Sequence, residues 1–516
     1  MNYSKLQKIV DIIYEYLTAQ EQDDGKYPFR IALLDPVANR IVGSHYALSH
    51  YCAGLYLQSH LKKNNAIRKR ADAVFRYVLD THHDFLKEFD YHHDFNNFAW
   101  ALLLKLNTQL SGLLPDMTRQ ACARLLIETG DSRHIAVNWL PMRAFNHMVR
   151  AELTGKNKFY RKGERLLKEI FAVKNADGFF EDSLKKGTSA NPQYHLFTVT
   201  VLLVGKHFQC FEFDMKELHD SIGLVIKHID PDGDFNYYGR GTNQIFGWGP
   251  MLFILKNLPV FGSYFEKCSS FVLSHIQNCL QNNGLLLENS IEHQFVTWRF
   301  YHYATVYISH LFFWLSVAQT LRLSICSSEI DLPQSNNINI LSSDRFFCAV
   351  FKGRKRFIAE KGPMLCNLWV KKRGSIFKGP FGPFNDCPPT KYDHITKTAV
   401  IANYLGPLIE TCRNDCSLSV SPVFPQKIDL VEDCNALRIT YSFKRAVGGS
   451  QFNLPVFGRL ALTEDVVNQI LKLSAGNDNL SFFRVGSIIG PYHELDVYRT
   501  KPIAPTLELI LTVRNE

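Results

Sequence analysis

The sequence has no hydrophobic run long enough to predict a membrane-spanning helix. Its most apolar stretch, ISHLFFWLSVAQTL, is shorter than the roughly 18 consecutive apolar residues that such a helix needs. The N-terminal stretch MNYSKLQKIVDIIYEYLTAQ carries Asp11 and Glu15 inside its apolar pattern, so it lacks the uninterrupted core of a signal peptide. We therefore expect no membrane span, and cytoplasmic residence is the default expectation, with export left open.

Cysteine pairs of the kind that hold metals or form a disulfide framework are also missing. The 12 cysteines stand singly in apolar runs such as HYCAGLYL and FFCAVF, and only Cys412 and Cys416 lie close together. This usage is typical of buried free thiols in a reducing compartment. The aspartates of DPDGD, residues 230 to 234, have a calcium-like spacing, but the later glutamate of an EF-hand is absent, so a turn is favoured. Adjacent His92 and His93 have no third ligand at a recognisable spacing, and we expect neither metal nor cofactor.

Signatures of nucleic-acid binding are absent too, although the chain is basic. The net charge is +9 and the pI is about 8.8, but lysines and arginines are spread along the sequence, without zinc-finger, basic-zipper or RNA-binding patterns. Such a balance favours a polyanionic partner if the charges gather in one cleft; otherwise it indicates a solvated basic surface. The aromatic content of 13%, with 38 Phe and 22 Tyr, is high enough to supply stacking faces for sugar rings.

The spacing of apolar residues divides the 516-residue chain into two parts, which indicates an α+β multidomain protein. Up to about residue 330 they recur at helical intervals, and we expect roughly twelve helices, starting near residues 3, 43, 66, 95, 116, 137, 157, 194, 215, 242, 261 and 300. These would form an (α/α) toroid, a ring of helical hairpins whose inner helix ends surround a central cleft. Residues 331 to 516 hold short runs such as RFFCAVF, ALRITYSF and LELILTV, which predict an antiparallel β-sandwich.

One stretch, DGDFNYYGRGTNQIFGWGP at residues 232 to 250, contains more polar and aromatic residues than a connecting loop requires. It combines five glycines with Arg240, Asn243 and the rings of Tyr238 and Trp248. Four other stretches are rich in polar and aromatic residues: YHHDFNNFAW with Asn97, VNWLPMRAFNHMVRA with Asn138 and Trp139, NADGFFEDSLKKGTSANPQYHLFTVT with Tyr194 and His195, and WRFYHYATVYISH with His302 and Tyr303. Packing explains some of them equally well, since Asn138 can be a helix N-cap and Trp139 a core residue. We expect the loops at residues 91 to 97, 134 to 139, 177 to 195 and 234 to 248 to converge on one end of the toroid, with the helix at 298 to 307 lining the same cleft.

The motifs GRGTNQIFGWG, DGFF, NW and YH together resemble those of (α/α)-toroid polysaccharide lyases, the hyaluronate/chondroitin lyase and heparinase II/III-like group. In that group a helical toroid precedes an antiparallel β domain, the order read here from periodicity. The resemblance implies a lyase that cleaves a uronic-acid-containing polysaccharide by β-elimination. Asp182 and Ser183 stand where these lyases often have a histidine, which makes His195 the nearest substitute.

This chemistry assigns a role to each candidate residue. Asn138 and Arg240 would clamp the carboxylate and stabilise the charge that develops as the neighbouring proton leaves. Tyr194 would transfer the proton, with His195 as its partner or as the alternative base. The sugar subsites would be shaped by Asn97, Trp139, Tyr238, Asn243, Trp248, His302 and Tyr303.

Two other functions remain open. A glycoside hydrolase on the same kind of toroid would act on glucuronides with two carboxylic groups. Asp177, Glu181, Asp182, Asp232 and Asp234 could supply them. A non-catalytic polysaccharide-binding protein would need the aromatic and arginine residues but not Tyr194 and His195. In each case the expected partner is an acidic polysaccharide or oligosaccharide.

Overall fold

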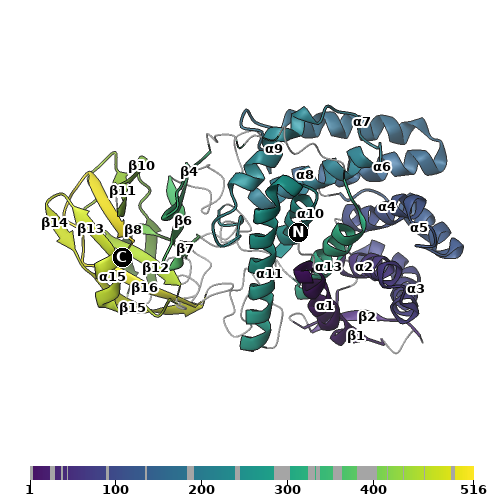
Figure 1. Cartoon of the computed structure of the whole chain (residues 1–516), viewed down its shortest axis with the longest axis horizontal. Helices are drawn as coiled ribbons and strands as arrows, with labels where there is room; N and C mark the ends of the chain where they lie inside the picture. Colours follow the sequence, from purple (N-terminus) through teal and green to yellow (C-terminus); the bar gives the residue numbers. More distant parts are fainter. Residues whose placement is uncertain are drawn as a thin grey trace.

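The computed structural model shows a helical part followed by a part built of β-sheets (Figure 1). The structure describes residues 4–23, 29–36, 39–42, 45–88, 92–133, 136–182, 191–238, 245–283, 303–323, 330, 332, 337–352, 363–379, 404–414, 417–433, 435–457, 460–489 and 494–515. Statements below refer to these residues.

The helices begin close to the twelve predicted starts. Those of the helical part are α1 (Ser4–Ala19), α2 (Ala47–Lys62), α3 (Asn65–Glu88), α4 (His93–Gln109), α5 (Asp116–Glu128), α6 (Leu140–Thr154), α7 (Asn157–Ala172), α8 (Pro192–His207), α9 (Lys216–Lys227), α10 (Trp248–Lys256), α11 (Gly262–Asn283) and α13 (Ala304–Thr320). Short 3-10 helices are η1 (Val137–Trp139), η2 (Ile245–Gly247) and η3 (Pro259–Phe261). A small sheet near the N-terminus contains β1 (Glu21–Gln22), β2 (Ala32–Asp35) and β3 (Arg40–Ile41).

Alternate helices form a closed inner ring. Helices α2, α4, α6, α8, α10 and α13 contact one another in this order, and α13 packs in turn against α2, while the intervening helices cover the outside. Inner helix α13 is buried on all sides from Ala304 to Ala318. Outer helix α7 buries only Gly163, Leu166, Leu167 and Ile170 and exposes its charged face. This arrangement is the predicted (α/α) toroid.

The β part consists of antiparallel sheets that share one core. The first contains β4 (Ile338–Ser342), β5 (Phe346–Phe351), β6 (Met364–Val370) and β7 (Gly374–Lys378). The second, in spatial order, contains β15 (Phe482–Ile489), β16 (Glu494–Thr500), β12 (Gln451–Phe457), β8 (Gly406–Asn414) and β9 (Ser417–Pro422). The third contains β10 (Lys427–Glu432), β11 (Ala436–Ser442), β17 (Glu508–Arg514), β13 (Leu471–Ala475) and β14 (Asp478–Leu480), and α15 (Glu464–Ile470) packs beside it.

The first sheet joins the two parts of the molecule, and it lies between the toroid and the other sheets in Figure 1. Alternate residues of β5, including Phe346, face the shared β core, whereas Phe347 and Phe351 pack against Tyr237 and Tyr238 of the helical part. Because strand side chains alternate between faces, this double contact explains why all six residues of FFCAVF are buried.

Two loops of the toroid that face this sheet share the same hydrogen-bond pattern and the same glycine position. In NADGFF, residues 175 to 180, the Asn175 Oδ1 atom accepts hydrogen bonds from the backbone N–H groups two and four residues later. In DPDGDF, residues 230 to 235, Asp230 Oδ1 accepts the corresponding bonds. The fourth residue of each loop is a glycine with positive φ, 86° at Gly178 and 99° at Gly233, where other residues would be strained. The turn interpretation of the aspartate-rich loop is therefore confirmed.

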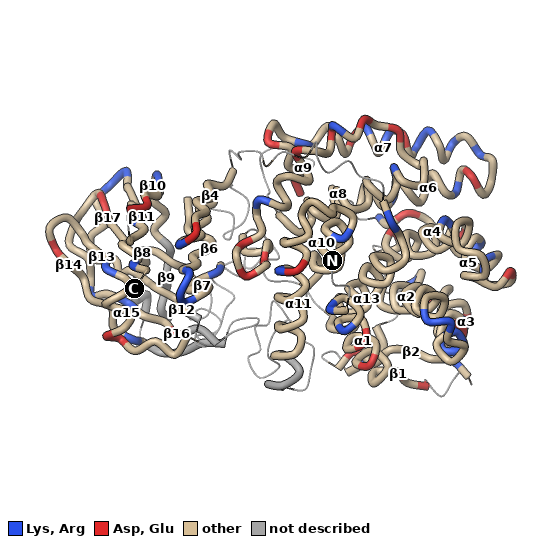
Figure 2. Tube along the Cα trace, viewed as in Figure 1, with Lys and Arg blue, Asp and Glu red and all other residues tan. Residues whose placement is uncertain are grey.

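The described cysteines lie in the interior, and charged residues of both signs lie along the outer helices. Cys52, Cys122, Cys210, Cys268, Cys348 and Cys366 are buried free thiols. Figure 2 shows lysines and arginines mixed with acidic residues along outer helices such as α7. Within the described residues, no single helix is long and apolar enough to cross a membrane, and only one sharply bent helix pair passes that test on length and composition.

Candidate active site

The inner helices all begin at one end of the toroid. Because outer and inner helices alternate along the chain, the inner helices run in the same direction. The residues at their starts are His45 and Tyr46 before α2, His92 at α4, Asn138 and Trp139 at α6, Tyr194 in the first turn of α8, Phe246 before α10 and Tyr303 at α13. The helix dipole gives each start a partial positive charge, so this end of the ring favours anions.

The rings at these starts form a continuous set, which we call the rim cluster: His45, His92, Phe95, Trp139, Tyr194, Phe246 and Tyr303. Ring centroids lie 4.8 Å apart for Tyr303 and His45, 4.4 Å for His45 and His92, and 5.7 Å for His92 and Trp139. Phe95 continues the set, 5.3 Å from Trp139 and 6.3 Å from Phe246, which lies 5.7 Å from Tyr194. The rim cluster therefore joins stretches that are far apart in the sequence. It includes a ring from each loop that was predicted to converge, 91 to 97, 134 to 139, 177 to 195 and 234 to 248, and one from the predicted 298 to 307 helix.

Tyr194 and Tyr303 bring phenol groups to the rim cluster. Tyr194 is half-buried and follows Asn191, whose side chain accepts the Tyr194 backbone N–H at 3.3 Å and so caps α8. Tyr303 is also half-buried, and its hydroxyl accepts a hydrogen bond of 3.1 Å from Arg40 Nη2. Both phenol groups are thus attached to fixed helix starts.

An amide and a neutral histidine complete this end of the ring. Asn138, beside Trp139, is 4% exposed, and its amide makes no side-chain hydrogen bond to any residue that the structure describes. Burial, with a smaller effect of the Arg40 charge, lowers the pKa of His45 to about 4, so its ring is neutral near pH 7. An amide of this kind can donate hydrogen bonds to an anionic group.

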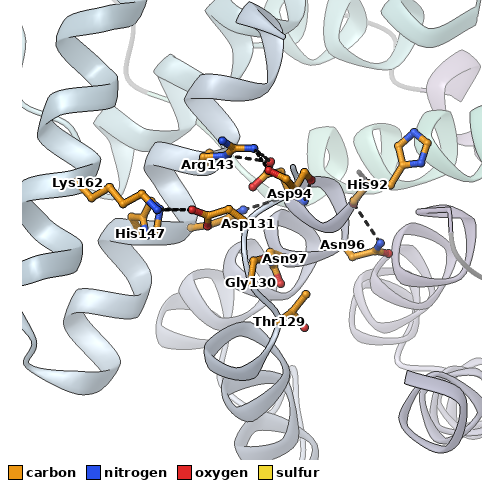
Figure 3. A network of polar contacts seen from close by, with 12 residues as sticks. His92, Asp94, Asn96, Asn97, Thr129, Gly130, Asp131, Arg143, His147 and Lys162 are labelled. Carbon is orange, nitrogen blue, oxygen red and sulfur yellow. Dashed lines mark hydrogen bonds and ion pairs between the residues drawn. The ribbon is translucent and has the colours of Figure 1, made fainter. Parts of the chain in front are cut away.

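A buried polar network holds the loop that precedes Asn138 (Figure 3). Arg143 donates two hydrogen bonds to Asp94 Oδ2, at 3.1 and 2.7 Å, and one of 2.7 Å to the Ser132 carbonyl. Asp131 accepts hydrogen bonds from His147 at 3.1 Å and Lys162 at 2.5 Å. The network fixes residues 129 to 132 between α5 and η1, and through them the start of α6.

His195 does not have the geometry of a catalytic base, contrary to the sequence prediction. Its Nδ1 atom accepts the backbone N–H of Phe180 at 3.0 Å, and its Nε2 atom lies 3.0 Å from the Ser221 carbonyl. The side chain is 1% exposed and stacks on Phe179, and its pKa is lowered by burial to about 4. Both ring nitrogens are occupied, so His195 connects α8 to the NADGFF loop and to α9 instead of taking a proton from a substrate.

Three predicted sugar contacts pack elsewhere. Tyr238 stacks on Phe351 between the toroid and the first sheet. Trp248 lies edge-on to Phe271 and His275 of α11, in the core. The buried amide of Asn97 donates to the Gly130 carbonyl at 3.1 Å and supports the loop of Figure 3. These side chains are occupied by protein contacts, so they do not offer the predicted subsites.

The remaining predicted site residues fall into two groups: those at the inner helix starts and those outside the described residues. Asn138, Trp139, Tyr194 and Tyr303 lie at the inner helix starts, whereas Arg240, Asn243 and His302 fall outside the described residues. Sequence reasoning missed His45; its position in the first turn of the helix predicted to start near residue 43 was the available signal. Among the described residues, no three His, Cys, Asp or Glu side chains are arranged to hold a metal ion.

The fold has counterparts among solved structures, although no family model and no curated protein matches the chain. Chondroitin AC lyase of Streptomyces coelicolor A3, in complex with chondroitin sulphate, is 11% identical with a TM-score of 0.47, over 99% of this chain and 79% of that one. A mutant of heparan sulfate lyase HepC from Pedobacter heparinus is 11% identical with a TM-score of 0.43, over 99% and 82%. A possible GH105 family member from Salmonella enterica is 11% identical with a TM-score of 0.41, over 62% and 94%.

Proposed function

We propose that this protein is a lyase that cleaves a uronic-acid-containing polysaccharide by β-elimination at the rim cluster. The observation that carries the proposal is the convergence of the inner helix starts, with the phenol of Tyr194, the amide of Asn138 and the ring of Trp139, at one end of the toroid. Helix starts favour anions, and aromatic rings favour sugar faces. A negatively charged sugar polymer combines both properties.

The proposed reaction requires that the carboxylate charge is stabilised, that the neighbouring proton is removed and that the leaving oxygen is protonated. Asn138 would hydrogen-bond the uronate carboxylate and stabilise the charge that develops when the neighbouring proton leaves. Arg240 lies outside the described residues, and its part in this clamp is proposed from the sequence alone. Tyr194, as phenolate, would take that proton. The electron pair of the broken C–H bond forms the new C=C bond, the glycosidic C–O bond breaks, and the Tyr194 proton passes to the leaving oxygen. One phenol can thus serve both proton transfers.

The contacts of the acidic residues disfavour the hydrolase alternative. Asp177 accepts a hydrogen bond from Asn337, Asp232 accepts bonds from Trp369 and Ser375, and Asp234 pairs with Lys378. These three carboxylates are engaged by the β part and are therefore unsuited to the hydrolytic pair that this alternative needs.

Incubation with a panel of uronic-acid polymers tests the proposal. Elimination places a C=C bond next to the carboxylate, so ultraviolet absorbance should rise in step with new reducing ends. New reducing ends without that absorbance would support the hydrolase and contradict the lyase. Binding of a polymer without any cleavage would support the non-catalytic alternative.

A further inference from the structure

A single lysine from the β part lies within the aspartate-rich loop of the toroid. The Nζ atom of Lys378, the last residue of β7, is 2.7 Å from Asp230 Oδ2 and 3.2 Å from Asp234 Oδ2. All three side chains are at most 5% exposed. The ammonium group therefore neutralises two buried carboxylates where the aspartate spacing alone would suggest a bound calcium ion.

Neighbouring strands of the same sheet satisfy the other oxygens of this loop. Asn367 donates to Asp230 Oδ2 at 2.8 Å, and Trp369 and Ser375 donate to the two oxygens of Asp232 at 2.9 and 2.5 Å. The first sheet thus holds the loop through a complete set of directed contacts, and Lys378 is the only cation among them within the described residues.

From this loop, contacts lead directly to the rim cluster. The ring of Phe235, next to Asp234, packs so closely on Gly247 that a Cβ atom there would lie 2.7 Å from Phe235 Cζ and 3.0 Å from Gln193 Cβ. Gln193 immediately precedes Tyr194, and Gly247 immediately follows Phe246. Phe235 thus contacts Gly247 at the start of α10, and Gly247 in turn lies against Gln193 at the start of α8.

We infer that Lys378 is a positioning residue for the proposed reaction: by holding Asp230 and Asp234, it fixes Phe235 and hence the place of Tyr194 at the rim cluster. The β part would accordingly contribute to catalysis without touching the substrate. The expected effect of Lys378 on kcat rests on the proposed function. Its expected effect on the position of Tyr194 does not. A displacement of about 1 Å at a reacting group can cost about 100-fold in rate.

The test compares Lys378→Met with Arg345→Met, both in the full-length protein. Arg345 pairs with Glu432 inside the β part at 2.8 Å, so its loss removes an ion pair without touching the toroid. On a polymer that the wild type cleaves, Lys378→Met should lower kcat about 10- to 100-fold and change KM less, whereas Arg345→Met should retain kcat. Hydrogen exchange of backbone amides should accelerate in residues 191 to 200 and 230 to 238 of Lys378→Met only.

The outcomes separate this inference from the proposed function. Wild-type kcat in Lys378→Met, or an equal loss of kcat in Arg345→Met, would overturn the inference even if the protein is a lyase. If no polymer is cleaved, the hydrogen-exchange experiment still tests whether Lys378 positions the start of α8. Unchanged exchange in residues 191 to 200 of Lys378→Met would overturn the inference. Should Lys378→Met fail to fold, Ser375→Ala removes one contact of Asp232 without leaving an unpaired charge, and it should give the same pattern with smaller changes.

Discussion

Arg143→Met should destabilise the toroid by about 3–5 kcal/mol, because it leaves the carboxylate of Asp94 buried without a counter-charge. Asp94 is fully buried, and Arg143 supplies two of its hydrogen bonds and a third to the Ser132 carbonyl. A loss of this size is a large part of the roughly 5–15 kcal/mol that stabilises a typical domain.

The pH dependence of this loss identifies its cause. Burial raises the pKa of Asp94, and the hydrogen bonds and charge of Arg143 oppose that effect, so removal of Arg143 should raise the pKa further. An aspartate whose pKa is higher in the folded than in the unfolded chain loses stability as the pH rises through its folded pKa. The penalty in Arg143→Met should therefore be larger at pH 8 than at pH 5.

Urea unfolding, followed by tryptophan fluorescence at both pH values, measures this penalty. Arg119→Met is the matched control, since its exposed pair with Asp116 should contribute no more than about 1 kcal/mol. Asp94→Asn combined with Arg143→Met should recover much of the stability at pH 8. A loss below about 1 kcal/mol in Arg143→Met, or a loss that does not vary with pH, would refute the buried-charge argument.

Three further predictions concern histidine burial, the core and the closure of the ring. Burial lowers the pKa of His50 to about 3 and that of His310 well below its usual value, so the unfolded chain takes up protons first as the pH falls. The free energy of unfolding should decrease below about pH 6.5, by up to about 1.4 kcal/mol per pH unit for each such histidine, and His310→Phe should reduce this slope in urea titrations. Trp248→Phe should lower the free energy of unfolding but leave KM for the polymer unchanged. An increased KM would support the sequence prediction that Trp248 contacts the sugar. Gly54→Ala should destabilise the contact of α2 with α13 by about 1–3 kcal/mol, since its Cβ atom would lie 2.5 Å from the ring of Phe312, and unchanged thermal unfolding would contradict that packing.

Local patterns predicted the elements better than they predicted the site. Helix starts such as Asp116 and Asn157 coincide with the expected positions, because apolar spacing records which face of a helix is buried. The strand FFCAVF was also expected, but its burial on both faces depends on a second layer that its own sequence does not specify.

The errors at the site also arise because contacts between distant elements are not specified by local sequence. Tyr238 and Trp248 stand in a glycine-rich stretch that fits a sugar site, yet their partners Phe351 and Phe271 come from distant elements. Conversely, His45 belongs to the rim cluster through ring contacts with His92 and Tyr303, which come from distant parts of the sequence.

The kcat of Tyr194→Phe on a polymer that the wild type cleaves, followed by the ultraviolet absorbance of the new double bond, tests the central claim most directly. The substitution removes only a hydroxyl group, so thermal unfolding should remain near that of the wild type. Tyr160→Phe, on the exposed face of α7, serves as the control. Loss of the proton-transfer group predicts a fall in kcat of about 10²- to 10⁴-fold in Tyr194→Phe and none in the control. Near-wild-type kcat in Tyr194→Phe would contradict the account.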